Sequence, residues 1–308
     1  MAMDNDPLDC LIVGGGPAGL TAAIYLARFL LRVRVVDEGR SRAGLIPCTR
    51  NVSGFPDGIS GHDLLERMRA QAEKYGVCFT QGRVTRLDPV DGGFEAEWGE
   101  GAATARTVLL ATGVRNRRPE MDEELHDEAL ARGLIRYCPI CDGYEVTDRK
   151  IGVIGSGSHG VAEALFLRGY TADVTLIAPD KAHGLDAADR KRLREYGIEA
   201  VDGPSRGVAL HQDCIVVDTA EGHYTFDSLY PALGSDVHNE LAEQIGAKTN
   251  DDTGCIAIDS HQRTSVVGVY AAGDVVIGLD QISHAMGEGG VAATTIRNDL
   301  SKVRPMKR

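Results

Sequence analysis

Two cysteines three positions apart are the residues best suited to chemistry in this chain. The segment Cys138-Pro139-Ile140-Cys141-Asp142 places two thiols within disulfide reach and an acid directly after the second. A Cys-x-x-Cys pair lowers the pKa of one thiol, so a thiolate forms near neutral pH and can attack a disulfide. Asp142 can carry the accompanying proton. The segment therefore predicts thiol–disulfide exchange, with Cys138, Cys141 and Asp142 as catalytic residues.

Two other interpretations of the cysteine pair have less support. A zinc site needs two more ligands at suitable spacing, and the sequence contains no second Cys-x-x-Cys and no His-x-x-His pair. A purely structural disulfide would suit a secreted framework, whereas the chain has an odd total of seven cysteines. The five others are isolated: Cys10, Cys48, Cys78, Cys214 and Cys255.

A glycine-rich loop near the N-terminus predicts a nucleotide site. Residues 14–19 read Gly-Gly-Gly-Pro-Ala-Gly, which satisfies G-x-G-x-x-G, between an apolar run at 8–13 and a helical pattern at 17–31. Such glycines permit the turn, let backbone N–H groups reach a pyrophosphate, and pack helix against strand. Asp37, with Glu38 beside it, follows the next β-branched run at 33–36 and can accept ribose hydroxyls. The motif alone does not distinguish FAD from NAD, and glycines also shape turns in ordinary α/β proteins.

The same pattern occurs a second time. A strand at 150–154 leads into Gly155-Ser156-Gly157-Ser158-His159-Gly160, a helix at 159–169 and a strand at 172–178. Gly155 and Gly157 are therefore candidate nucleotide-binding residues as well. Two such repeats predict an α/β chain with two Rossmann-like, three-layer domains.

The remaining segments indicate how the two domains are connected. Residues 76–113 read as short strands with turns, residues 268–274 as a strand, and residues 284–300 as a helix rich in small residues. We expect one domain inserted into the other, with crossovers near 115–118 and 233–246. The first domain would comprise residues 1–117 and 246–308. The second, carrying the cysteine pair, would comprise residues 118–245.

Composition and charge exclude some classes of partner. The chain has 308 residues, of which 43% are hydrophobic, and a net charge of −12. This charge repels nucleic-acid phosphates and anionic membranes, so a small-molecule or protein substrate is expected. Residues 1–8 are short and acidic, and the apolar run after them breaks at Gly14, which fits neither a signal peptide nor a membrane span. We therefore expect a cytoplasmic protein.

The motifs together resemble those of the low-molecular-weight thioredoxin reductases, a class of pyridine nucleotide-disulfide oxidoreductases. The usual redox segment there reads C-A-T-C-D-G, and the similarity covers nearly the whole chain in order. It is carried by the segments GGGPAGLTAA, NVSGFPDGISGHDLL, LLATGVRNR, CPICDGYE, TSVVGVYAAGDV and DQISHAMGEGGVAAT. The resemblance implies FAD as cofactor, a homodimer, and a thioredoxin-like protein or a small-molecule disulfide or dithiol as partner.

The resemblance also assigns site residues. Cys141 would be the sulfur nearest the flavin, Cys138 the one that exchanges with substrate, and Asp142 the acid/base. Asp274 could instead be a turn or helix-capping acid, and Asn51 a turn residue. The flavin site would comprise Gly14, Gly16, Pro17, Ala18, Gly19, Asp37, Glu38, Asn51, Val84, Ala111, Thr112, Gly113, Gly273, Asp274, Gln281 and Ile282.

The second loop departs from the family pattern at the nucleotide clasp. Residues 176–180 read Leu-Ile-Ala-Pro-Asp, where thioredoxin reductases carry H-R-R-x-x-x-R. Those arginines hold the 2′-phosphate of NADPH, whereas an aspartate repels it. NADPH, NADH, a second flavin nucleotide, or no nucleotide in a fold kept for its packing all remain open.

A second departure introduces a histidine. The segment 280–284 reads Asp-Gln-Ile-Ser-His in place of the family's Arg-Gln-Ala triplet. His284 is a candidate base for a thiol proton, because imidazole titrates near neutrality. It could equally be an ordinary helix histidine or a neighbour of the flavin phosphates.

Three functions follow from these observations. The first is a reductase, in which a reduced nicotinamide, ferredoxin or another donor reduces FAD and then the cysteine pair. The second is a dithiol oxidase that runs the other way, from a dithiol to oxygen, with hydrogen peroxide as product. The third is a flavin-bearing redox sensor or binding module without turnover, which an intact C-x-x-C-D segment disfavours.

Overall fold

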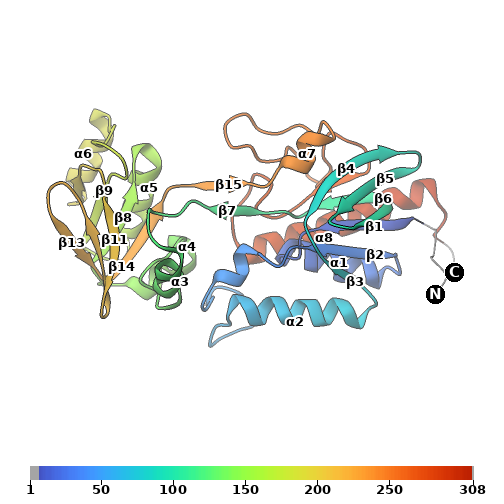
Figure 1. Cartoon of the computed structure of the whole chain (residues 1–308), viewed down its shortest axis with the longest axis horizontal. Coiled ribbons are helices and arrows are strands. Elements are labelled where there is room, and N and C mark those ends of the chain that lie inside the picture. Colours follow the sequence, from blue (N-terminus) through green and yellow to red (C-terminus); the bar gives the residue numbers. More distant parts are fainter. Residues whose placement is uncertain (1–6, 307–308) are drawn as a thin grey trace. The chain divides into compact units, whose positions relative to one another are not determined.

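The computed structural model describes residues 7–306, which fall into two compact units (Figure 1). Unit 1 comprises residues 7–45, 60–115 and 237–306, and unit 2 comprises residues 46–59 and 116–236. Most of the N-terminal segment for which we predicted no signal peptide, residues 1–6, lies outside the described residues.

Unit 1 has a seven-stranded sheet covered by helices. The strands run in the order β3-β2-β1-β6-β5-β4, and β16 also pairs with β6. The strands are β1 (Leu8–Val13), β2 (Val33–Asp37), β3 (Cys78–Gln81), β4 (Val84–Val90), β5 (Gly93–Trp98), β6 (Gly101–Leu110) and β16 (Val269–Ala271). The helices are α1 (Pro17–Arg28), η1 (Arg42–Leu45), α2 (Gly61–Lys74), α7 (Glu240–Gln244) and α8 (Ile282–Val303).

Alternating side chains of the central strands build two cores in unit 1. Along β1, Cys10 and Ile12 belong to the core shared with α1 and α8, whereas Leu11 and Val13 belong to the core shared with β4, β5 and α7. This alternation follows from the two-residue period of a strand. Burial on both faces explains why residues 8–13 read as a continuous apolar run.

Unit 2 is a smaller α/β unit of the same kind. Its parallel sheet has the order β10-β9-β8-β14, and an antiparallel sheet, β11-β12-β13, lies beside it. The strands are β8 (Ile151–Gly155), β9 (Val174–Ile177), β10 (Glu199–Val201), β11 (Gly207–His211), β12 (Cys214–Asp218), β13 (His223–Phe226) and β14 (Ser228–Ala232). The helices are α3 (Glu123–Ala131), α4 (Pro139–Asp142), η2 (Gly143–Val146), α5 (Gly157–Leu167) and α6 (Ala187–Glu195).

Two of the passages between the units run along short strands, β7 (Val114–Asn116) and β15 (Ser235–Val237), which pair with each other. The divisions fall after Leu45, Ile59, Arg115 and Asp236, so residues 46–59, 116 and 117, which we assigned to the first domain, group with unit 2. Residues 237–245, which we assigned to the second domain, group with unit 1. The reason is that α7 in this segment packs on β4, and Leu241 and Ala242 join the core around it.

The predicted fold class, α/β with two Rossmann-like units, is confirmed. The first helix is shorter than predicted: it ends at Arg28 rather than continuing to residue 31, because Leu30 adopts a positive φ of 65° and turns the chain toward β2. Among the described residues, no helix is long and apolar enough to cross a membrane.

Candidate active site

The first glycine loop lies where the ends of four parallel strands meet. Val13 of β1 is in register with Val36 of β2 and with Leu110 of β6, and Leu110 is in register with Ala271 of β16. The residues at or just after the ends of these strands therefore share one edge of the sheet: Gly14, Asp37, Ala111, Thr112, Gly113, Gly273 and Asp274. Ligands of open α/β sheets bind beyond the carboxyl ends of the strands.

Three glycines of the loop leave no room for a side chain. Gly14 has a φ of +106°, and a Cβ atom there would lie 2.2 Å from the carbonyl oxygen of Ala111. A Cβ atom on Gly15 would lie 2.6 Å from Oδ2 of Asp37, and one on Gly19 would lie 2.1 Å from the carbonyl oxygen of Gly14. The backbone is thus packed as a nucleotide-binding turn requires.

The start of α1 is suited to an anion. Within the described residues, α1, α5 and α8 begin without a side-chain cap hydrogen bond and without an acid in the first turn. By contrast, Ser60, Asp122 and Asp186 cap α2, α3 and α6, and each of these helices has an acid in its first turn. Uncapped N–H groups and the positive end of the helix dipole favour a phosphate. Residues 14–19 and Asp37 therefore fit the pyrophosphate and ribose of FAD.

Asp274 belongs to a charged cluster at the same edge. Arg42 donates to Asp274 at 3.1 Å and to Asp280 at 2.9 Å. Burial raises the pKa of Asp274, and Arg42 opposes that rise. On α8, His284 contacts Glu288 at 3.1 Å, and the carboxylate of Glu288 accepts from the N–H of Gly273 at 2.7 Å. His284 thus contacts a partner in unit 1, and the Cys138–Cys141 pair belongs to unit 2.

The other predicted flavin residues are distributed as follows. Thr112 donates to the carbonyl oxygen of His238 at 2.6 Å, and Gln281 is buried at the start of α8. Val84 is buried at the start of β4, two residues after Gly82, whose N–H donates to the carbonyl oxygen of Asp37. Glu38 is exposed, and Pro17, Ala18 and Ile282 lie in the first turns of α1 and α8. Asn51 lies in unit 2, where it accepts from Thr49 at 3.0 Å.

The cysteine pair stands at the start of α4 in unit 2. Cys138 and Cys141 form a disulfide, with Cα atoms 5.2 Å apart. Cys138 is the N-cap of α4, and its sulfur accepts from the N–H of Cys141 at 3.1 Å. Both cysteines are half-buried, whereas the neighbouring Ile140 and Tyr144 are 50% and 80% exposed. The segment around the disulfide is thus partly exposed to solvent.

Asp142 is held in a partly closed environment beside the disulfide. Arg136 donates to its Oδ2 at 3.0 Å, and the hydroxyl of the buried Tyr230 donates to its Oδ1 at 2.8 Å. Burial raises the pKa of Asp142, while Arg136 and Tyr230 partly offset the rise. A carboxyl group with a raised pKa, directly after one of two bonded cysteines in the chain, is suited to donate and accept a proton.

The second glycine loop has a nucleotide-type backbone. The segment after β9, where the family's arginines would bind the 2′-phosphate, instead makes hydrogen bonds within unit 2. Gly157 has a φ of +59°, and a Cβ atom on Gly155 would lie 2.9 Å from that of Ala232. Beyond β9, the carbonyl oxygen of Pro179 accepts from the N–H of Ser205. Arg190 follows shortly after, but its guanidinium donates to the carbonyl oxygens of Leu185 and His183. The segment after β9 therefore bonds to neighbouring segments of its own unit.

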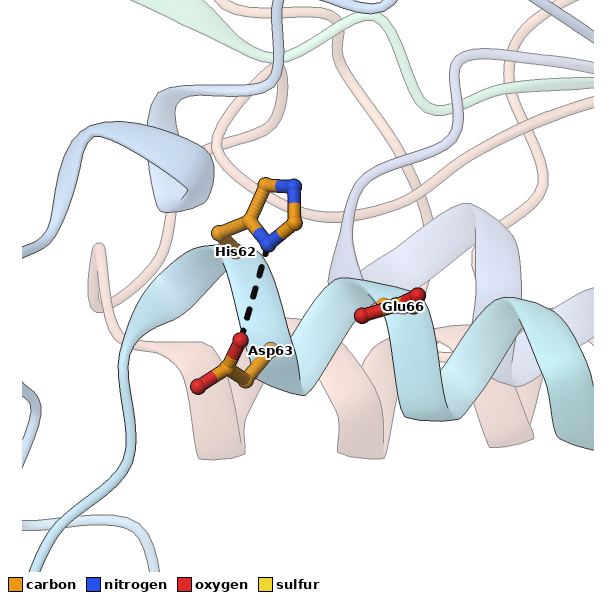
Figure 2. A group of neighbouring side chains, drawn as sticks. All are labelled: His62, Asp63 and Glu66. Carbon is orange, nitrogen blue, oxygen red and sulfur yellow. Dashed lines mark ion pairs between the residues drawn. The ribbon is translucent and has the colours of Figure 1, made fainter.

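A separate group of potential metal ligands lies on the first turns of α2. Figure 2 shows His62, Asp63 and Glu66, of which His62 and Asp63 form an ion pair at 3.6 Å. All three side chains are exposed, and Asp63 also provides the N–H that Ser60 caps. Exposed acidic groups at a helix start are common, and we assign no metal here.

Sequence reasoning missed several residues of these sites. Arg136 and Tyr230 bind Asp142, and Arg42 joins Asp274 to Asp280, although Arg42 and Asp274 are 232 positions apart. Glu163 of α5 was missed as well, and its side chain is 13% exposed. A signal was available only for Glu163, as an acid inside an otherwise apolar and small-residue helix.

Comparisons with known proteins agree with this geometry. The model of the family described as pyridine nucleotide-disulphide oxidoreductase matches residues 8–289. A thioredoxin reductase of Treponema pallidum is 33% identical over 94% of this chain and 96% of its own length. One of Listeria monocytogenes is 29% identical over 99% and 97%. The solved thioredoxin reductase of Streptococcus pyogenes superposes with a TM-score of 0.88, at 27% identity over 97% of this chain and all of that one.

Proposed function

The chain belongs to the pyridine nucleotide-disulphide oxidoreductase family, and from this premise we propose that it moves electrons between FAD and the Cys138–Cys141 pair. It is a flavin-dependent disulfide oxidoreductase related to the thioredoxin reductases. The terminal partner of the pair is a disulfide or dithiol on a thioredoxin-like protein or a small molecule.

One observation carries the proposal: a half-buried disulfide is followed in the chain by a half-buried acid, Asp142, whose pKa is raised. A structural disulfide needs no proton carrier, whereas exchange is faster when an acid protonates the sulfur that leaves. Arg136 and Tyr230 fix the Asp142 carboxyl in place with one hydrogen bond to each oxygen. The arrangement is therefore suited to turnover.

Unit 1 supplies the residues that would hold the flavin. The glycine loop and the start of α1 would bind the pyrophosphate, Asp37 the ribose of the adenosine, and Asp274 with residues 281–282 the flavin half. When bound, FAD supplies the two-electron redox chemistry. The protein's own part in the reaction is to position the cysteine pair and to hold or release a proton at Asp142.

The surroundings of the disulfide support a substrate that approaches from solvent. Cys138 begins α4, and the exposed Ile140 and Tyr144 lie on either side of Cys141 and Asp142. Exposed apolar side chains beside a reactive group favour contact with a protein or an apolar dithiol. Cys138 would exchange with that substrate, and Cys141 would exchange electrons with the flavin.

The choice of electron donor depends on the second glycine loop and the segment after β9. The uncapped start of α5 favours a nucleotide pyrophosphate, but Pro179 and Asp180 replace the arginine clasp and Arg190 is engaged elsewhere. We therefore propose weak or no preference for NADPH over NADH. The missing arginines favour two alternatives. One is a donor without nicotinamide, such as ferredoxin, and the other is a dithiol that feeds electrons through FAD to oxygen.

Anaerobic mixing of the purified yellow protein with NADPH, NADH or a dithiol tests the proposal. The readout is loss of the flavin absorption band at about 450 nm. We expect the dithiol to bleach the band and NADPH to have no advantage over NADH. Rapid bleaching by NADPH alone would contradict the donor proposal. Failure of every donor to bleach the band would contradict the function itself.

A further inference from the structure

A buried glutamate supports the turn that leads to Asp274. Glu288 lies inside α8 and is 8% exposed. Its Oε2 atom accepts from the N–H of Gly273 at 2.7 Å, and its Oε1 atom lies 3.1 Å from Nε2 of His284. Burying a carboxyl group is unfavourable unless its oxygens have partners. Each oxygen of Glu288 has one, so the side chain is fixed in its place.

The contact with Glu288 begins where the hydrogen bonds of the sheet end. The N–H of Ala272, just beyond β16, still donates to the carbonyl oxygen of Leu110 in β6. The next N–H, that of Gly273, donates to Glu288 instead. Gly273 has a φ of +81°, and a Cβ atom there would lie 2.9 Å from that of Ala18. Glu288 therefore holds the first residue of a turn that packs on the start of α1, where the pyrophosphate is expected.

His284 adds a second contact from the same helix. It lies one turn before Glu288, and its side chain is 41% exposed. A Cβ atom on Gly278 would lie 2.7 Å from Nε2 of His284 and 3.4 Å from Oε1 of Glu288. The backbone of the loop between β16 and α8 therefore lies against the imidazole and the carboxyl group together. The two side chains support this loop at Gly273 and again at Gly278.

The loop is also tied to η1. Arg42 donates to Asp274 at 3.1 Å and to Asp280 at 2.9 Å, so one guanidinium bridges two acids of the loop. Residues 273–280 are thus held by α8 at Gly273 and by η1 at the two acids. A binding segment that is fixed before its ligand arrives loses less conformational entropy when the ligand binds.

We propose that Glu288, supported by His284, is a positioning residue for the flavin: it holds Gly273 and Asp274 in the arrangement that binds the cofactor. The proposal deepens the proposed function and rests on it, because it presumes that FAD lies beyond the ends of these strands. In this account the partner of His284 is Glu288, and the imidazole is not a base for a thiol proton.

Matched substitutions separate the acceptor atoms of Glu288 from its volume. Glu288→Gln keeps an oxygen that can accept from the N–H of Gly273, whereas Glu288→Met has a similar length and no oxygen. Thr295→Val, at a buried position further along α8, is the packing control. Each full-length protein is loaded with FAD. The readouts are the dissociation constant of FAD, from flavin fluorescence on dilution, and hydrogen–deuterium exchange in a peptide that covers residues 270–276.

For Glu288→Met we expect an affinity for FAD about tenfold lower than in wild type, and faster exchange at residues 270–276. Glu288→Gln should keep both properties near wild type. Thr295→Val should lower the melting temperature and change neither readout. Unchanged affinity and exchange in Glu288→Met would overturn the proposal. Equal losses in Glu288→Met and Glu288→Gln would also overturn it, because the acceptor oxygen would then not be the feature that matters.

His284→Leu keeps the proposal testable if Glu288→Met does not fold. This variant leaves the acceptor of Gly273 in place and removes the partner of the other carboxyl oxygen, so the affinity for FAD should fall by about threefold. An affinity equal to that of wild type would overturn the proposal. Failure of the proposed function would look different: wild type would bind FAD without exchanging electrons with the disulfide, or would not bind it at all. Exchange at residues 270–276 would still measure the contact with Gly273.

Discussion

At the scale of single residues, we predict that exchange chemistry depends on Asp142. Both of its carboxyl oxygens are engaged, and burial raises its pKa. An asparagine has the same shape but cannot donate an acidic proton. We expect Asp142→Asn to lower the rate of disulfide exchange at pH 7 by about 10²–10⁴-fold. Stopped-flow kinetics would measure this, with the fully exposed Asp213→Asn as control. An unchanged rate would remove Asp142 from the mechanism.

Glu163 gives a second prediction, in the pH dependence of stability. Its pKa is raised from 4.5 to about 7 in the folded chain, so between these values the folded state binds more protons than the unfolded state. The free energy of unfolding contributed by this group therefore falls as pH rises through that window. Glu163→Gln removes the effect.

Urea unfolding of Glu163→Gln and wild type at pH 5 and pH 8 would measure the difference. Relative to wild type, the variant should gain on the order of 1–3 kcal/mol between the two pH values. The comparison uses differences between proteins, so other carboxyl groups with raised pKa values, such as Asp274, cancel. A variant whose stability follows wild type at both pH values would show that Glu163 is not held protonated.

At the scale of elements, the first glycine loop and α1 should act as one unit with the flavin. Gly19 lies inside α1, and a Cβ atom there would lie 2.1 Å from the carbonyl oxygen of Gly14. Gly287 lies inside α8, and a Cβ atom there would have no atom of another segment within 4 Å. The two glycines share helical backbone and differ in their surroundings. They form a matched pair.

Gly19→Ala should displace the loop, lower the affinity for FAD at least about tenfold and reduce the melting temperature. Gly287→Ala should bind FAD as wild type does and gain up to about 1 kcal/mol of stability, because alanine is the better helix former. Flavin fluorescence on dilution and thermal unfolding would measure both effects. Equal FAD affinity in the two variants would contradict the role of the loop.

At the scale of the whole molecule, we predict a homodimer. Apolar side chains on one end of α1 and on α8 are exposed in the isolated chain: Tyr25 at 45%, Phe29 at 37% and Val291 at 40%. A second copy of this surface would cover them. Light scattering should report a dimer, and Tyr25→Lys with Val291→Lys should shift it toward monomer while the flavin band persists. The control Val267→Lys, at a 95% exposed position, should leave the dimer unchanged. A monomeric wild type would refute the prediction.

The sequence predicted the features that depend on the order of neighbouring residues. Apolar runs, glycine spacing and the helices between them are properties of neighbouring residues, and they gave both Rossmann-like units and the strand ends where Gly14, Asp37 and Asp274 stand. The helix end at Arg28 was misplaced because the left-handed turn at Leu30 has no glycine to mark it.

The partners of Asp142 could not be predicted, because Tyr230 comes from a distant part of the chain. Tyr230 is 88 positions from Asp142, and no periodic pattern joins them. The same holds for Arg42 and Asp274. These contacts depend on how separate strands and helices pack, which a single sequence does not state. The sequence showed that the family's arginines are missing after β9. It did not show that Arg190 donates hydrogen bonds to the backbone carbonyls of Leu185 and His183.

The central claim is that FAD and the cysteine pair exchange electrons, and one measurement tests it most directly. Wild type, Cys138→Ser and Cys141→Ser are each loaded with FAD and mixed with dithiothreitol without oxygen, while the band at about 450 nm is followed. We predict that wild type bleaches and that both variants stay yellow, because the dithiol reaches the flavin only through the disulfide. Bleaching of either variant at the wild-type rate would contradict the account.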